Sequence, residues 1–227
     1  MSGIARYKDL CLDVGDAPAM ARFWAAVLGL GPVTDKGGPW HIAGPTPQHA
    51  VWVDPVPDPH TVKRLHLDVH CASIDELVAL GARVQRELPR WTIMLDPEGG
   101  EFCAFVRAEP PPLRLYELVL DAADPVRLGR WWADVLGAGS VEVEGDSFGL
   151  TEVPGAPFEW FVVGAGSEPE QRPNRVHFDV AVESAAGVAA LVTAGATVLR
   201  EPGHETPWTV LADPEGNEFC AFADGVA

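Results

Sequence analysis

Two histidines occupy equivalent places in two similar segments and are the first candidates for chemistry. His66 lies in Arg64-Leu-His-Leu-Asp-Val69, and His177 lies in Arg175-Val-His-Phe-Asp-Val180. Because successive residues of a strand point to opposite faces, each histidine falls on a polar face that backs a row of apolar side chains. A histidine and a neighbouring carboxylate can act as acid and base without a metal. A structural histidine that only forms hydrogen bonds is the alternative.

A second candidate group follows a turn that occurs twice. Asp96-Pro-Glu-Gly-Gly-Glu-Phe-Cys-Ala-Phe105 and Asp213-Pro-Glu-Gly-Asn-Glu-Phe-Cys-Ala-Phe222 differ only at Gly100 versus Asn217. Pro and Gly favour a tight reversal, and the alternation that follows predicts a strand. A carboxylate and a thiol share one face of this strand, as Glu101 and Cys103 in one copy and Glu218 and Cys220 in the other. The alternatives are a solvated carboxylate and a thiol that packs as a small apolar side chain.

These segments belong to an internal duplication that spans the chain. Leu12 to Gly29 matches Leu120 to Gly137, and the other matches keep their order and nearly their spacing. We therefore predict two copies of one domain at residues 1–108 and 114–227. The Pro-rich residues 109–113 form a stiff linker between them.

Within each half the pattern predicts a strand, a helix and further strands, and then the same order again. In the first half, a strand at 8–14 precedes a helix that begins after Asp16 and ends at Gly29. Ser73 opens a second helix, which ends at Gly81. The remaining strands are expected near residues 39–43, 50–53, 64–70, 91–95 and 101–106. Each half is thus expected to hold two βαβββ units.

Composition excludes several classes of protein. The 227 residues carry 16 basic and 33 acidic side chains, a formal charge of −17, which argues against binding to a nucleic-acid backbone. The charge favours neutral or cationic ligands, unless it serves only solubility. There is no apolar run of about 18 residues for a membrane span. The N-terminus lacks an apolar signal, and four cysteines do not suggest a disulfide framework, so we expect a cytoplasmic protein with reduced thiols.

Four motifs recur in order in both halves and resemble the vicinal oxygen chelate superfamily, which has the glyoxalase/bleomycin-resistance/extradiol-dioxygenase fold. In the first half they are Phe23-Trp24…Leu28-Gly29, His66-Leu-Asp-Val69, Leu80-Gly-Ala82 and Asp96-Pro-Glu-Gly-Gly100. Within the superfamily the chain is most similar to the glyoxalase-like proteins common in actinobacteria. The resemblance implies an α+β fold of two tandem domains, each a pair of βαβββ units that form a curved mixed sheet around a cleft. Whether paired units come from one half or exchange between halves or chains is left open.

The resemblance also implies a divalent metal in this cleft. It assigns ligand positions to Asp9 and Glu117 on the first strands and to His66 and His177 on the first strands of the second units. The usual glutamate on the last strand is replaced by Cys103 and Cys220, which leaves Glu101 and Glu218 nearby as ligands or catalytic groups. The fourth position is apolar, at Val53 and Phe161. Zinc, nickel, iron and manganese all suit such donors. In the alternative, Asp9 and Glu117 pair with Arg64 and Arg175.

Three tryptophans on or beside the expected strands are candidate ligand contacts, namely Trp52, Trp91 and Trp208. Indoles in an acidic cleft suit a flat or cationic ligand, whereas tryptophans that pack under helices would have no such role. Two functions follow from the resemblance. The first is a lyase, isomerase or dioxygenase that acts on a small oxygenated molecule, with His66, His177, Glu101 and Glu218 as catalytic candidates. The second is a drug- or metabolite-binding protein without chemistry. We expect a monomer or a homodimer.

Overall fold

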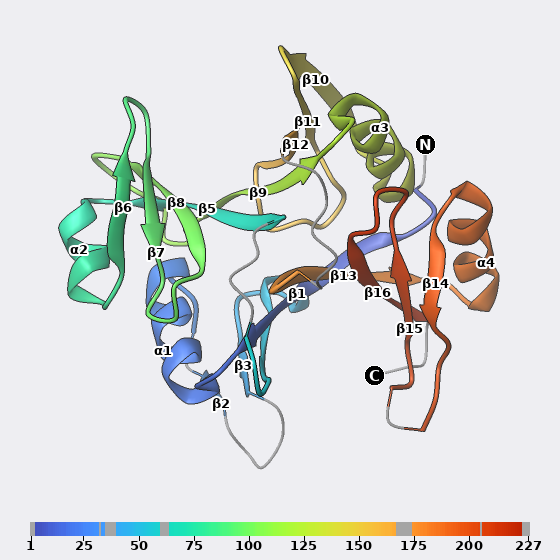
Figure 1. Ribbon diagram of the computed structural model, residues 1–227, viewed down its shortest axis with the longest axis horizontal. Helices are drawn as coiled ribbons and strands as arrows, with labels where there is room; N and C mark the ends of the chain where they lie inside the picture. The colour runs from blue at the N-terminus through green and yellow to red at the C-terminus, as the bar shows by residue number, and fades with distance from the viewer. Residues whose placement is uncertain are drawn as a thin grey trace.

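The computed structural model describes residues 3–31, 33–34, 40–59, 64–166, 174–204 and 206–223. In this part of the chain four units follow one another, each with the predicted βαβββ order (Figure 1). Unit 1 consists of β1 (Arg6–Val14), α1 (Ala17–Leu28), β2 (Val33–Thr34), β3 (Trp40–Ile42), the short 3₁₀ helix η1 (Pro47–His49) and β4 (Val51–Pro55). Unit 2 consists of β5 (Leu65–Cys71), α2 (Ile74–Ala79), β6 (Arg83–Glu87), β7 (Thr92–Leu95) and β8 (Glu101–Val106). Unit 3 consists of β9 (Leu115–Ala122), α3 (Pro125–Leu136), β10 (Ser140–Glu144), β11 (Ser147–Thr151) and β12 (Trp160–Ala165). Unit 4 consists of β13 (Val176–Val182), α4 (Ala185–Ala194), β14 (Thr197–Arg200), β15 (Thr209–Ala212) and β16 (Glu218–Ala223).

The units pair across the two halves of the chain. The first sheet has the order β14-β15-β16-β13-β1-β4-β3-β2 and joins units 1 and 4. The second has the order β10-β11-β12-β9-β5-β8-β7-β6 and joins units 2 and 3. The predicted α+β class and the pairing of βαβββ units are confirmed. The sequence left open whether the paired units come from one half, and in the structure each pair contains one unit from each half. The short connection from β8 to β9 keeps units 2 and 3 in one sheet, which leaves units 1 and 4 to pair with each other.

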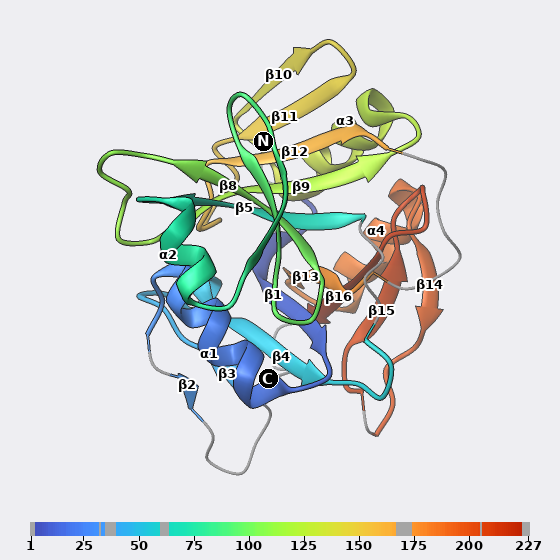
Figure 2. The same cartoon turned by 60° about the vertical axis from the view of Figure 1, so that its left-hand side comes forward.

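Each sheet is centred on an antiparallel pair of first strands. β1 pairs with β13 in the first sheet, and β5 pairs with β9 in the second. The last strand of each unit lies parallel to its first strand, as in β5 with β8 and β13 with β16. In Figure 2, strands β5, β9 and β12 of the second sheet lie above β1 and β4 of the first. The central pairs therefore join unit 1 to unit 4 and unit 2 to unit 3.

Helices α1 and α3 connect the two sheets through one apolar core. α1 packs on β3 and β4 of the first sheet, while its Trp24 ring lies 5.3 Å from Phe102 on β8 of the second. In α3, the Trp132 ring lies 5.9 Å from Phe161 on β12 and 4.8 Å from Phe178 on β13. The main cluster of buried apolar residues is continuous across all four units. The two halves thus share a core.

The helix ends follow the predicted capping residues. Asp16 accepts a hydrogen bond from Ala19 N, and Gly29 ends α1 with a φ of 67° that suits glycine. Asp124 and Gly137 do the same for α3. None of the helices in the described ranges is long and apolar enough to cross a membrane.

The duplicated turn is held by its own aspartate and, in the first copy, is bonded to the start of α1. Asp96 Oδ1 accepts hydrogen bonds from Glu98 N at 2.9 Å and Gly100 N at 2.8 Å, and Asp213 closes the second turn in the same way. The carboxylate of Glu98 accepts from Gly15 N and Asp16 N at the start of α1.

Arg175 joins this first turn from the other half of the chain, where it pairs with Asp96 and with Glu98. Arg64 donates in return to the carbonyl oxygen of Glu215 in the second turn. The two arginines therefore bind the turns and do not pair with Asp9 and Glu117. This rules out the ion pairs that were the alternative to metal binding in the sequence analysis.

Candidate functional site

The candidate residues lie on the face of each sheet that points away from the shared core, here called the site face. On β1, Leu10 and Leu12 pack into the core, so the alternate residue Cys11 points to the site face. On β5, Leu65 and Leu67 pack into the core, and His66 points the other way. Because the first strands form the middle of each sheet, their site-face residues are close to residues from a unit of the other half.

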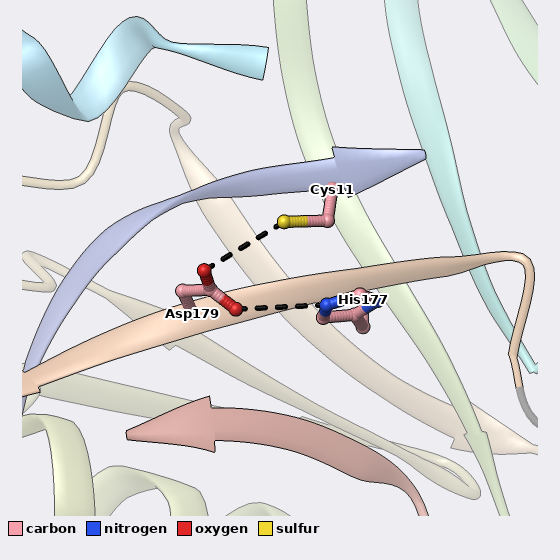
Figure 3. A group of neighbouring side chains, drawn as sticks. All are labelled: Cys11, His177 and Asp179. Atoms are coloured by element: carbon pink, nitrogen blue, oxygen red, sulfur yellow. Dashed lines mark hydrogen bonds and ion pairs between the residues drawn. The ribbon is translucent and has the colours of Figure 1, made fainter. Parts of the chain in front are cut away.

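Cluster 1 consists of Cys11, His177 and Asp179 in the first sheet (Figure 3). Cys11 on β1 is the direct cross-strand partner of His177 on β13, and Asp179 follows two residues later on the same face. Cys11 Sγ lies 3.6 Å from Asp179 Oδ2, and His177 Nε2 lies 3.6 Å from Asp179 Oδ1. One donor atom from each residue lies within 4.8 Å of the other two.

Cluster 2 consists of His66, Asp68 and Cys103 in the second sheet. Asp68 on β5 is the parallel neighbour of Cys103 on β8, and His66 Nε2 lies 3.2 Å from Asp68 Oδ1. The His66 side chain is 8% exposed, whereas the His177 side chain of cluster 1 is 20% exposed. Cluster 1 is thus the more accessible of the two.

A further carboxylate stands beside each cluster. Asp9 is the cross-strand partner of Asp179, and Glu117 is the cross-strand partner of Asp68. Burial, together with the negative charge of Asp9, raises the pKa of Asp179 well above its usual range. Burial and the charge of Asp68 raise the pKa of Glu117 to about 7. Two acids side by side at sites largely shielded from water favour a shared proton or a bound cation, because both forms relieve the repulsion.

The donor atoms of cluster 1 have the character of metal ligands. Burial lowers the pKa of His177 to about 4, so its imidazole is neutral near neutral pH and keeps a free lone pair. Among the described residues, the buried atoms Asp9 Oδ1 and Asp179 Oδ1 have no donor group within hydrogen-bond distance, and the two carboxylates interact with each other. A buried carboxylate oxygen without a partner is costly, and a divalent cation would satisfy it. Burial and the charges of Asp179 and Asp9 raise the pKa of the Cys11 thiol, so a bound metal would have to displace its proton. Thiolate, imidazole and carboxylate together are then a donor set that zinc prefers.

The structure combines the predicted residues across halves. Asp9 does not meet His66, because β1 and β5 lie in different sheets; it lies beside cluster 1, whose histidine is His177. Glu117 lies in turn beside cluster 2, whose histidine is His66. The candidate ligands therefore combine across the halves. Asp9 of the first half lies beside His177 of the second, and Glu117 of the second half lies beside His66 of the first.

The predicted glutamates lie near the clusters without joining them. Glu101 and Glu218 precede Cys103 and Cys220 by two residues on the same strands. Cys103 belongs to cluster 2, and Cys220 Sγ lies 3.8 Å from His177 Nε2 at the margin of cluster 1. The roles of Glu101 and Glu218 stay predictions. The fourth family position supplies no ligand, because Val53 and Phe161 are buried in the core.

Three cluster residues were missed from the sequence, namely Cys11, Asp68 and Asp179. The signal for the two aspartates was present in the His-x-Asp pattern of both copies, which places them on the same strand face as the histidines. Cys11 had the weaker signal of sharing a face with Asp9 on the first strand. Its contact with Asp179 depends on the pairing of β1 with β13, which sequence spacing does not reveal.

The predicted tryptophans flank the clusters. Trp52 Nε1 donates to Asp9 Oδ2 at 2.9 Å. Trp208 stacks on Phe222 of β16 with ring centroids 4.9 Å apart, and in the second sheet Trp91 stacks on Phe105 of β8 at 5.9 Å. Since Phe222 and Phe105 share a strand face with Cys220 and Cys103, each aromatic pair forms a wall beside its cluster.

Comparisons with known proteins agree with this architecture. A family model described as a glyoxalase-like domain matches residues 9–105 and again residues 117–222. Among solved structures, glyoxalase I from Zea mays superposes with a TM-score of 0.69 at 15% identity, over 96% of this chain and 92% of that chain. A putative dioxygenase from Bacillus subtilis superposes with a TM-score of 0.64 at 12% identity, over 99% of this chain and 87% of that chain. A search of curated proteins found no match. At these identities the structural likeness concerns the fold alone.

Proposed function

This chain belongs to the glyoxalase-like domain family, and from that premise we propose that it binds a divalent metal, zinc, at cluster 1 and there binds a small molecule with neighbouring oxygen atoms. The carrying observation is the convergence of Cys11, His177 and Asp179 on one sheet face, with a neutral imidazole and a buried, unpartnered carboxylate oxygen. The partial exposure of His177 supports cluster 1 over cluster 2 as the site that a ligand reaches.

The proposed chemistry is that of a metal-dependent lyase or isomerase. A bound zinc would act as a Lewis acid on a substrate oxygen. Asp9 is the proton acceptor that the geometry favours. Its Oδ2 accepts from Lys8 Nζ at 2.6 Å and from Trp52 Nε1 at 2.9 Å, so the carboxylate is held in one orientation. Its Oδ1 has no hydrogen-bond partner among the described residues and is the atom at which a proton would be taken up.

The second candidate function is binding without chemistry, as in a drug- or metabolite-binding protein. The observation that favours it is the cysteine at the position where the family usually carries a glutamate, at Cys103 and at Cys220. A buried thiol is a poor proton acceptor, and burial raises the pKa of Cys220 above its usual value. Conversion of a bound ligand, followed by product analysis, separates the two functions.

Metal content tests the proposal. Untagged protein is incubated with zinc, nickel, iron or manganese, passed through a desalting column and analysed for metal per chain. We expect one zinc at cluster 1, lost in His177→Ala and weakened in Cys11→Ser. His66→Ala tests cluster 2 separately. His49→Ala is the matched control, because His49 bonds to Thr46 at the surface and, among the described residues, belongs to neither cluster. Absence of metal after every incubation, or equal zinc content in His177→Ala, would contradict the proposal.

A further inference from the structure

A β-bulge interrupts the central strand pair at the same place in both sheets. In the pairing of β1 with β13, Tyr7 faces Val180 and Asp9 faces Asp179, so Lys8 has no cross-strand partner. In the pairing of β9 with β5, Leu115 faces Val69 and Glu117 faces Asp68, so Tyr116 is the residue left over. A bulge residue is unpaired, so its side chain need not follow the alternation of the strand and can point to the same face as the next residue.

The bulge brings Lys8 onto the site face next to Asp9, although the two residues are neighbours in sequence. Lys8 Nζ lies 2.6 Å from Asp9 Oδ2 and 4.0 Å from the centre of the Phe222 ring, and its side chain is 27% exposed. Phe222 thus contacts both Lys8 and its stacking partner Trp208. The ammonium group therefore stands between the acid beside cluster 1 and the aromatic wall.

Tyr116 occupies the equivalent place in the second sheet. Its ring stacks on His70 at 4.3 Å and meets the edge of Phe105 at 5.2 Å. The wall beside cluster 2 thus ends in a phenol, where the wall beside cluster 1 ends in a cation. The second site also has a cation here, but it is Arg107, whose guanidinium carbon lies 5.7 Å from the centre of the Tyr116 ring.

The position of Lys8 changes the ligand class expected from the net charge alone. A cationic ligand would have to displace the Lys8 ammonium from the Phe222 ring and would be repelled by it. An ammonium has three donor hydrogens, and the ion pair with Asp9 needs one of them. A divalent ion at cluster 1 would add two positive charges beside the Lys8 ammonium, and both cations attract an anionic group on the ligand.

We propose that the site at cluster 1 selects a small oxygenated ligand that also carries a carboxylate, and that Lys8 is the residue that binds this carboxylate. This specificity rests on the proposed metal function. The metal takes the neighbouring oxygens, the Phe222 and Trp208 wall borders an apolar or aromatic part, and Lys8 donates a charge-assisted hydrogen bond to the acid. In cluster 2 the equivalent bulge residue is the neutral Tyr116, so that residue does not select a carboxylate.

Two probes that differ by one charge test the proposal. 3,4-Dihydroxybenzoate and its methyl ester share an aromatic ring and two adjacent hydroxyl groups, and only the first carries a carboxylate, which is separate from the adjacent oxygens. Binding of each to zinc-loaded protein is followed by tryptophan fluorescence and calorimetry. We expect the acid to bind about tenfold more tightly than the ester, the effect of one charge-assisted hydrogen bond. Lys8→Met should remove this preference, Lys8→Arg should keep most of it, and Tyr116→Phe at the matched bulge should leave it unchanged.

Metal content and thermal stability are measured on the same samples, so that failure of selectivity is distinguished from failure of metal binding. Equal affinity for the two probes in the zinc-loaded wild type, no binding of either, or a preference that persists in Lys8→Met with zinc still bound overturns the proposal and leaves the metal function standing. A zinc content that does not depend on His177 instead overturns the proposed function itself.

Discussion

Replacement of Arg175 should be among the most destabilising single changes in this protein. The guanidinium is 5% exposed and donates to the Asp13 carbonyl at 3.0 Å and to Glu98 at 3.0 Å, in addition to its ion pair with Asp96. Arg175→Met keeps the apolar stem but leaves the Asp96 carboxylate, itself almost fully buried, without its cation. Removing one partner of a buried ion pair costs about 3–5 kcal/mol.

The expected loss is large enough to measure by heat or urea. For a chain of this size, that cost lowers the melting temperature by about 6–20 °C. Arg64→Met is the matched control from the equivalent position, because Arg64 donates to the Glu215 carbonyl at 3.2 Å and not to a carboxylate. Its loss should be about 1–2 kcal/mol.

The second copy of the turn supplies a rescue. There, Asn217 stands at the position of Gly100. Its Nδ2 donates to Asp213 Oδ2 at 2.7 Å, as Arg175 Nη1 donates to Asp96 Oδ2 in the first copy. A side chain at Gly100 overlaps the Arg175 guanidinium, so Gly100→Asn alone should destabilise strongly. In Gly100→Asn combined with Arg175→Met the overlap with the guanidinium is removed. A small shift of the Asp96 carboxylate, whose Oδ2 lies 2.8 Å from the new Cβ, then lets the amide donate to it as in the second copy.

The double variant should therefore be more stable than either single variant, with a favourable coupling of about 3 kcal/mol in a double-mutant cycle. Urea denaturation of the wild type, the two single variants and the double variant measures this quantity. Additive losses, or a loss below about 1 kcal/mol for Arg175→Met, would refute the assignment of Arg175 as the counter-ion of a buried acid.

Three further measurements follow from the geometry. Trp132→Phe should lower the free energy of unfolding by about 1–3 kcal/mol more than Trp24→Phe at the equivalent position. The reason is that Trp132 Nε1 donates to Asp213 Oδ2 at 3.2 Å, while Trp24 Nε1 has no hydrogen-bond partner among the described residues. Equal losses in urea denaturation would contradict this. The four cysteines are free and buried, and burial raises the pKa of Cys71 to about 11, so a thiol reagent at pH 8 should label them rapidly only in denaturant; fast labelling of native protein would count against the burial. Zinc at about 100 times its dissociation constant should stabilise the fold by about 2.7 kcal/mol, and a chelator or His177→Ala should abolish this gain; an unchanged melting curve would contradict metal binding to the folded state.

The duplicated pattern was visible in the sequence because its signals are local. Alternation in the strands, Asp and Ser at helix starts, and Gly at helix ends each depend on a few neighbouring residues, and the helices at α1 and α3 begin and end accordingly. The same alternation placed His66 and His177 on the site face. The order of motifs, repeated, also indicated the family, which the match over residues 9–105 and 117–222 bears out.

The composition of each site was decided by tertiary structure. Cys11 and His177 become partners only because unit 1 pairs with unit 4, and no local pattern selects that pairing over one within a half. Lys8 reaches the site face only through a bulge, since strict alternation would place it opposite Asp9. The ion pair of Arg175 with Asp96 also joins the two halves, and sequence spacing does not reveal it either. The sequence by itself determined which residues each strand offers; long-range strand pairing and its register decided which of them meet, because backbone hydrogen bonds between distant strands carry no local signal.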